Sequence, residues 1–138
     1  MFAELKKYKN KGFFTFTKGE KLSEQSKYVP NLPGVYFVES VVGTKKEIVY
    51  IGKSGTYLGE GQFSKQQLRR RINNSHDSKS RQTYFEEKLK SEAIESLKLS
   101  WFVTFDDTNK DLPAYVEALL IQDFFDKYKR LPRWNREF

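Results

Sequence analysis

Cysteine is absent from this sequence of 138 residues, which excludes disulfide bonds and thiolate metal ligands and fits a reducing compartment. No apolar run approaches the roughly 20 residues that a membrane-spanning helix needs. The N-terminal residues also lack the apolar core and small-residue cleavage site of a secretory signal. Internal repeats and low-complexity tracts are missing as well. We therefore expect a soluble, cytoplasmic protein with no membrane partner.

Aromatic and basic residues are plentiful instead. Aromatic side chains make up 16% of the sequence and hydrophobic residues 38%, which predicts one folded domain with a buried core. The net charge of +7 favours a polyanionic partner such as nucleic acid, although a solvated lysine-rich surface explains the same charge. The lysine-rich residues 1–28 predict a basic N-terminal arm with one short strand, ahead of a domain at 29–138.

Hydrophobic periodicity predicts an α/β (α+β) fold, in which helices flank a small three-stranded mixed or antiparallel sheet. A hairpin is expected from residues 34–39 and 47–51, with a turn at Gly43 and Thr44. A glycine-rich loop at 52–62 follows. The later elements are a helix at 65–74, a helix at 83–97, a strand at 98–105 and a helix from Pro113 to about Lys129.

Two tyrosines occupy corresponding positions in the predicted hairpin. Tyr36 and Tyr50 are equidistant from Gly43, and residues that lie opposite each other in an antiparallel pair have numbers with a constant sum. The two phenols would then face each other on one side of the sheet. They either converge on a common site or simply pack as an aromatic cross-strand pair.

Glu117 has an unusual position in the last predicted helix. At about 100° per residue, it falls in the middle of an apolar stripe. That stripe consists of Leu120, Ile121, Phe124 and Tyr128. A carboxylate that faces a core is costly unless it is paired, protonated or bound to a cation. Glu117 is therefore a candidate metal-binding or catalytic acid; the alternatives are an anion favoured by the helix N-terminus and a buried ion pair.

Three successive arginines occupy the helix expected after the glycine-rich loop. Their side chains point about 100° apart, so the three cannot share one role. Arg71 lies next to the apolar stripe of Leu68 and Ile72 and should point into the domain. Arg69 and Arg70 should face solvent. Because guanidinium groups bind phosphate in a bidentate manner, an inward arginine near two tyrosines and a glutamate would form a phosphate site.

Five short motifs occur in an order that resembles the GIY-YIG nuclease family. They are Gly-Val-Tyr at 34–36, Tyr-Ile-Gly-Lys at 50–53, Leu-x-x-Arg-Ile at 68–72, Glu-x-x-Leu-Ile at 117–121 and Pro-Arg-Trp-Asn at 132–135. Together they extend over nearly all of residues 29–138. The resemblance implies the GIY-YIG nuclease fold and a metal-dependent DNA endonuclease.

The resemblance also implies a role for each matched residue. Glu117 would bind one divalent cation, Mg²⁺ or Mn²⁺, and Arg71 would neutralise the charge that develops on the scissile phosphate. Tyr36 would orient or activate the attacking water, with help from Lys53. Tyr50 would position the water or the phosphate.

Asn135 would brace this site by hydrogen bonds.

The sequence departs from the family pattern at two places. Residues 56–64 look inserted, and an enlarged loop of this kind occurs in small members that restrict foreign DNA. Many members carry His or Tyr four residues after the arginine, whereas here that position is Ser75 and the single histidine, His76, comes next. His76 is either part of the site or an exposed loop residue.

The expected partner is DNA, bound by a monomer or a homodimer. Sequence-independent phosphate contacts are expected from five basic residues, namely Lys6, Lys7, Lys65, Arg69 and Arg70. Restriction and DNA repair are both plausible settings, and a single small site would cut both strands only as a dimer or by two successive nicks. The alternatives are a non-catalytic nucleic-acid-binding module on the same fold and a protein–protein adaptor with a basic surface.

Overall fold

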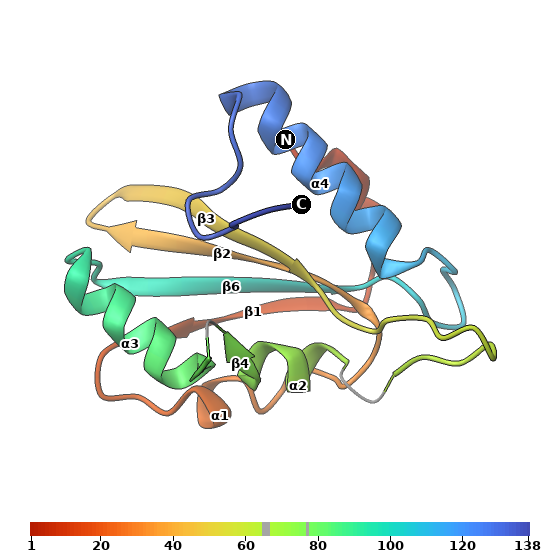
Figure 1. Ribbon diagram of the computed structural model, residues 1–138, viewed down its shortest axis with the longest axis horizontal. Helices are drawn as coiled ribbons and strands as arrows, with labels where there is room; N and C mark the ends of the chain where they lie inside the picture. Colours follow the sequence, from red (N-terminus) through yellow and green to blue (C-terminus); the bar gives the residue numbers. More distant parts are fainter. Residues whose placement is uncertain (65–66, 77) are drawn as a thin grey trace.

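A four-stranded antiparallel sheet forms the centre of the molecule in the computed structural model, which describes residues 1–64, 67–76 and 78–138 (Figure 1). The strands lie in the order β1-β6-β2-β3. Their bounds are Lys11–Phe16 for β1, Ser96–Val103 for β6, Gly34–Val42 for β2 and Lys45–Lys53 for β3. The α+β class is confirmed. The count of three strands is wrong, because all six residues of β1 pair with β6.

The N-terminal segment belongs to the domain and does not form a separate arm. The core includes Leu5 from the 3-10 helix η1 (Ala3–Lys7), Tyr8 directly after that helix and Phe16 from strand β1, each at most 4% exposed. The lysines that separate these residues are exposed to solvent. The N-terminal segment therefore has a buried apolar side, which is not apparent from its high lysine content.

Helices cover both faces of the sheet. On one face, η1 and α4 (Pro113–Tyr128) pack on the side chain of Val35. On the other face, α2 (Leu68–Asn73) and α3 (Arg81–Ser91) pack on the side chain of Tyr36. Strand β2 is consequently buried on both sides. The remaining short elements are α1 (Leu22–Gln25), β4 (Ser75–His76) and β5 (Lys79–Ser80).

Helix α3 is shorter than the predicted helix at 83–97. It begins after Ser80, whose Oγ accepts a hydrogen bond of 3.1 Å from the Thr83 N–H. It ends before Ala93, which has a left-handed φ of 51°. Leu97 therefore starts the alternation of β6, where it is fully buried, and does not continue the helical stripe.

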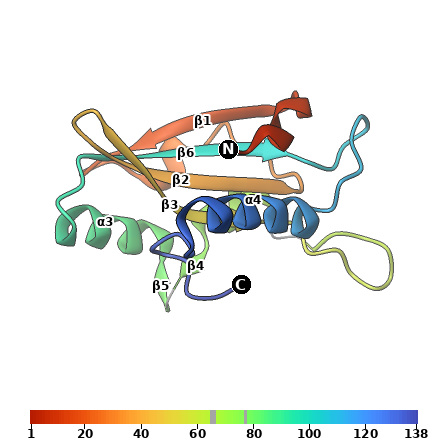
Figure 2. The ribbon, with the colours of Figure 1, turned by 90° about the horizontal axis from the view of Figure 1, so that it is seen from above.

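The loop between β3 and α2 is closed by its own contacts. The Ser64 N–H donates a hydrogen bond of 2.8 Å to the Thr56 carbonyl, and the Tyr57 and Phe63 rings lie 4.9 Å apart. This loop projects from one end of the molecule (Figure 2, yellow-green). None of the helices within the described ranges is both long enough and apolar enough to cross a bilayer.

Candidate active site

Tyr36 and Tyr50 lie on the same face of the sheet, but not directly opposite each other. Tyr36 pairs with Gly52 and Tyr50 pairs with Val38. The predicted direct pairing is wrong for two reasons: the turn is centred between Gly43 and Thr44, with Val42 paired to Lys45, and the register then shifts at Val49, which is an extra residue in β3. Without that bulge, Tyr50 would point to the opposite face, because a shift of one residue turns every side chain over. The tyrosine rings lie diagonally, with centroids 6.0 Å apart.

Close packing explains two of the motif glycines. A Cβ atom on Gly52 would lie 2.8 Å from Tyr36 Cζ and 2.8 Å from Tyr50 Cε2, so only glycine lets both rings lie over this residue. A Cβ atom on Gly34 would lie 2.1 Å from the Phe102 carbonyl oxygen and 2.9 Å from Leu68 Cδ1. Gly34 therefore allows β2 to approach β6 while α2 packs on top.

Glu117 is partly buried on α4 and lies within electrostatic reach of two other elements. Burial raises the pKa of its carboxyl to about 7, against the opposing effect of Lys53 from β3 and Arg71 from α2. Burial, followed by the neighbouring Tyr36, also raises the pKa of Tyr50, and the Glu117 carboxylate adds to that rise. Glu117 thus interacts electrostatically with two cations and a phenol from two other elements.

The stripe around Glu117 is buried over most of its length. Leu120, Ile121 and Phe124 are each at most 4% exposed. Tyr128, in the last turn of α4, is 44% exposed and packs against Phe124 with ring centroids 4.6 Å apart. Its predicted place in the buried stripe is therefore wrong, because the helix ends at this residue.

The three arginines of α2 separate as their helical spacing predicts. Arg69 and Arg70 are exposed, whereas Arg71 is partly buried. The Nε atom of Arg71 is fully buried, and no hydrogen-bond partner is found for it in the described ranges. A buried donor without a partner is costly, so Arg71 holds an unused hydrogen-bond donor beside Glu117.

Asn135 braces strand β3 through its side-chain amide. Its Nδ2 donates a hydrogen bond of 2.9 Å to the Ile51 carbonyl, and its Oδ1 accepts one of 3.0 Å from the Ile51 N–H. The Trp134 N–H donates to the Val49 carbonyl at 2.9 Å. The C-terminal segment therefore lies along the outer edge of β3, beside the two residues that flank Tyr50.

Arg81, the first residue of α3, was missed by the sequence analysis. Its Nη1 donates a hydrogen bond of 2.9 Å to Tyr36 Oη, and its guanidinium carbon lies 5.6 Å from the centre of the Tyr50 ring. Burial opposes its charge, but Tyr36 and then Tyr50 outweigh that effect and hold the pKa of Arg81 above its usual value. A sequence signal existed, because Arg81 lies four residues before Phe85, on the same apolar stripe.

Several predicted contact residues lie elsewhere or outside the described residues. His76 belongs to β4, but its side chain is not described, and Lys65 is also outside the described residues. Lys6 and Lys7 are exposed on η1, on the face of the sheet that α4 covers. The Lys7 ammonium pairs with Asp111 at 2.6 Å.

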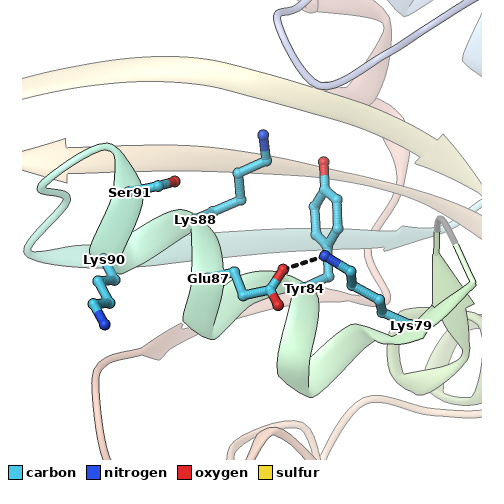
Figure 3. A pocket seen from close by; sticks show the side chains of 6 residues that line it. All are labelled: Lys79, Tyr84, Glu87, Lys88, Lys90 and Ser91. Carbon is cyan, nitrogen blue, oxygen red and sulfur yellow. Dashed lines mark hydrogen bonds and ion pairs between the residues drawn. The ribbon is translucent and has the colours of Figure 1, made fainter.

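A basic hollow beside α3 is a second candidate site (Figure 3). It has a volume of about 480 Å³. Its lining residues are Lys79, Tyr84, Glu87, Lys88, Lys90 and Ser91. Lys79 pairs with Glu87, Lys88 lies over the Tyr84 ring, and Lys90 points away from the others (Figure 3). Its lysine charges are therefore largely engaged by neighbours or directed away from the hollow.

The donor set at Glu117 fits a metal ion that the substrate helps to bind. Within the described ranges, no group of three or more His, Asp, Glu or Cys side chains could hold a metal by itself. Mg²⁺ is often bound through one or two carboxylates, with water and phosphate oxygens in the other positions. A single acid such as Glu117, within electrostatic reach of two cationic side chains, is compatible with that arrangement.

Comparison with known proteins adds no relative. No family model matches the chain, no curated protein matches it, and no solved structure matches it. The likeness to GIY-YIG nucleases therefore stays a prediction from the residues quoted above.

Proposed function

We propose that this protein is a metal-dependent endonuclease that hydrolyses DNA phosphodiester bonds, as the GIY-YIG resemblance implies. One observation supports the proposal above the others. Glu117 is a partly buried carboxyl with a pKa of about 7, beside cations from two other elements and within electrostatic reach of Tyr50. Acids with strongly raised pKa values, placed beside specific charged partners, are concentrated at functional sites.

Arg71 and Lys53 would bind the non-bridging oxygens of the scissile phosphate. A phosphodiester is negatively charged, and hydrolysis increases the charge on its oxygens. Arg71 has a buried Nε–H that lacks a partner within the described ranges, and a guanidinium group can bind two phosphate oxygens at once. Lys53 follows Gly52 directly at the end of β3 and adds a second positive charge beside Glu117.

The two tyrosines would have different roles because their surroundings differ. Burial raises the pKa of Tyr50, so its phenol keeps the proton at neutral pH and would donate a hydrogen bond to water or phosphate. Tyr36 would orient the attacking water, and the hydrogen bond that it accepts from Arg81 would fix its phenol. Tyr50 is also the more exposed of the two, so it would be the closer one to the substrate.

Glu117 would hold one divalent cation, Mg²⁺ or Mn²⁺. That cation would polarise the phosphate and stabilise the negative charge on the leaving oxygen. Glu117 can bind a metal only as the carboxylate, and a bound cation would favour that form. Asn135 would keep β3, and with it Tyr50 and Lys53, in register with this acid.

DNA outside the scissile position would be held by unspecific phosphate contacts. Arg69 and Arg70 are exposed on the same short helix as Arg71, so they would contact phosphates next to the cleaved one. The projecting loop at 54–64 would contact the duplex at the end of the molecule where it lies (Figure 2). Restriction of foreign DNA and DNA repair are both compatible with such contacts.

The test is cleavage of supercoiled plasmid DNA with Mg²⁺ or Mn²⁺, by the wild type and by the Glu117→Gln and Arg71→Ala variants. We expect nicked or linear product from the wild type only, with at least a hundredfold loss in each variant. Asp126→Asn is the matched control for the acid, because Asp126 is exposed on the same helix. Arg130→Ala is the control for the guanidinium, because Arg130 follows the opposite end of α4.

Three other outcomes would contradict the proposal. A wild type that binds DNA but cuts none across metals and substrates would be a nucleic-acid-binding module. A wild type that neither binds nor cuts would point to an adaptor. Equal activity in wild type and Glu117→Gln would assign any cleavage to a different site or to a contaminating nuclease.

A further inference from the structure

Arg81 is the one charged side chain that the structure buries almost completely within the described ranges. It is 3% exposed, and the other buried polar residues of the described ranges are serines and a threonine. Removing a charge from water costs several kcal/mol unless its surroundings compensate. Such a residue is retained where its charge acts on neighbouring groups.

The groups that act on the Arg81 charge are phenols. Its Nη1 donates to Tyr36 Oη at 2.9 Å, and its guanidinium carbon lies over the rings of Tyr50 and Phe85, at 5.6 Å and 5.8 Å from their centres. No salt bridge to a carboxylate is recorded for Arg81 in the described part of the chain. The charge is therefore directed at the oxygen of Tyr36 and the face of Tyr50.

The contacts of Arg81 distinguish between two ways in which it would take part in catalysis. A guanidinium that binds the substrate phosphate directs its donors at that anion, whereas Arg81 already donates from Nη1 to Tyr36 Oη and lies against the Tyr50 and Phe85 rings. Arg81 therefore acts through the side chain that it touches.

We propose, on the basis of the nuclease function proposed above, that Arg81 is a positioning residue for Tyr36. Its hydrogen bond fixes the orientation of the Tyr36 phenol, the group proposed above to orient the attacking water. A charged donor also makes this contact stronger than a neutral one would be.

The kinetic test combines Arg81→Gln, Arg81→Lys and Tyr36→Phe in the cleavage of a labelled duplex. We expect Arg81→Gln to lower kcat at least tenfold while KM stays within about twofold, and Arg81→Lys to recover part of the loss. Added to Tyr36→Phe, Arg81→Gln should cost less than a further twofold, because its effect passes through the missing hydroxyl. Wild-type kcat in Arg81→Gln, or fully additive losses, would overturn the proposal.

A second measurement needs neither metal nor DNA. With 3-fluorotyrosine placed at position 36, we expect the ¹⁹F resonance to move or broaden in Arg81→Gln and Arg81→Lys, and to stay unchanged in the Arg130→Gln control. An unchanged resonance in both Arg81 variants would refute the contact itself. A wild type that never cuts DNA would instead overturn the nuclease proposal, and with it the catalytic role of Arg81.

Discussion

At the scale of single residues, the cost of keeping Glu117 charged inside the fold is the most informative quantity. Its partial burial outweighs the attraction of Lys53 and Arg71 and raises the pKa of its carboxyl from 4.5 to about 7. A group of this kind destabilises the fold when it ionises. That destabilisation is expected where an acid is placed to bind a cation that the protein alone does not supply.

The Glu117 carboxyl should make stability depend on pH in metal-free buffer. Below about pH 4.5 it is protonated in both the folded and the unfolded chain. Between about pH 4.5 and 7 the unfolded chain releases this proton and the folded chain keeps it, so the free energy of unfolding falls as pH rises. Glu117→Gln should therefore raise the free energy of unfolding at pH 8 by on the order of 1–3 kcal/mol, and hardly at pH 4.5.

Denaturant melts of the wild type and Glu117→Gln at both pH values measure this difference. Asp126→Asn, which changes an exposed acid on the same helix, should show no such pH dependence. Mg²⁺ or Mn²⁺ at pH 8 should stabilise the wild type and leave Glu117→Gln unaffected. A variant less stable than the wild type at pH 8 would mean that Glu117 is a structural member of an ion pair.

At the scale of elements, the position of strand β3 depends on the bulge at Val49 and on the C-terminal segment along its outer edge. The bulge at Val49 turns Tyr50 to the face of Tyr36, and the C-terminal segment then covers the outer edge of the strand. The same segment is anchored by Trp134, which is 4% exposed and donates a hydrogen bond of 3.1 Å to Glu92. The position of Tyr50 therefore depends on residues more than eighty positions away.

Replacing Asn135 tests this dependence. Asn135→Ala removes two hydrogen bonds to the backbone of Ile51 and should lower the free energy of unfolding by about 1–3 kcal/mol. Cleavage should fall by a larger factor than DNA affinity, because β3 carries Tyr50 and Lys53. Asn10→Ala, at an exposed asparagine, is the control and should change neither. Unchanged stability and cleavage in Asn135→Ala would show that the β3 edge holds without this side chain.

At the scale of the whole molecule, the N-terminal segment combines a structural part and an electrostatic part. Strand β1 closes the edge of the sheet at β6, while the lysines of η1 add to the net charge of +7. The Lys7–Asp111 pair is largely exposed, so it contributes at most about 1 kcal/mol to stability. Truncation and charge removal should therefore have different effects.

Deleting residues 1–16 should abolish cooperative unfolding, because it removes β1 and the buried side chains of Leu5, Tyr8 and Phe16. The double variant Lys6→Gln/Lys7→Gln should instead stay folded and bind DNA more weakly. If both lysines contact phosphates, the slope of log affinity against log salt should decrease by about 0.9 for each. A truncated chain that unfolds cooperatively and cuts like the wild type would restore the view of a dispensable arm.

Sequence periodicity by itself determined the elements whose pattern is local. Alternation predicted β6 and its buried face, and helical spacing predicted that Arg71 turns inward while Arg69 and Arg70 face solvent. It also predicted that Glu117 lies among apolar neighbours on α4. These features depend on contacts between residues a few positions apart, so their repeat is visible in the chain.

Only the tertiary structure decided the features that join distant segments. The lysines of the first 28 residues hide the pairing of β1 with β6, and an extra residue at Val49 changes which side chains lie opposite in the hairpin. Arg81 contacts Tyr36 across 45 positions of sequence. From its charge alone, Arg81 would be expected on the exposed face of a helix. Long-range pairing and burial determine these contacts, and no local pattern records which partner a side chain will meet.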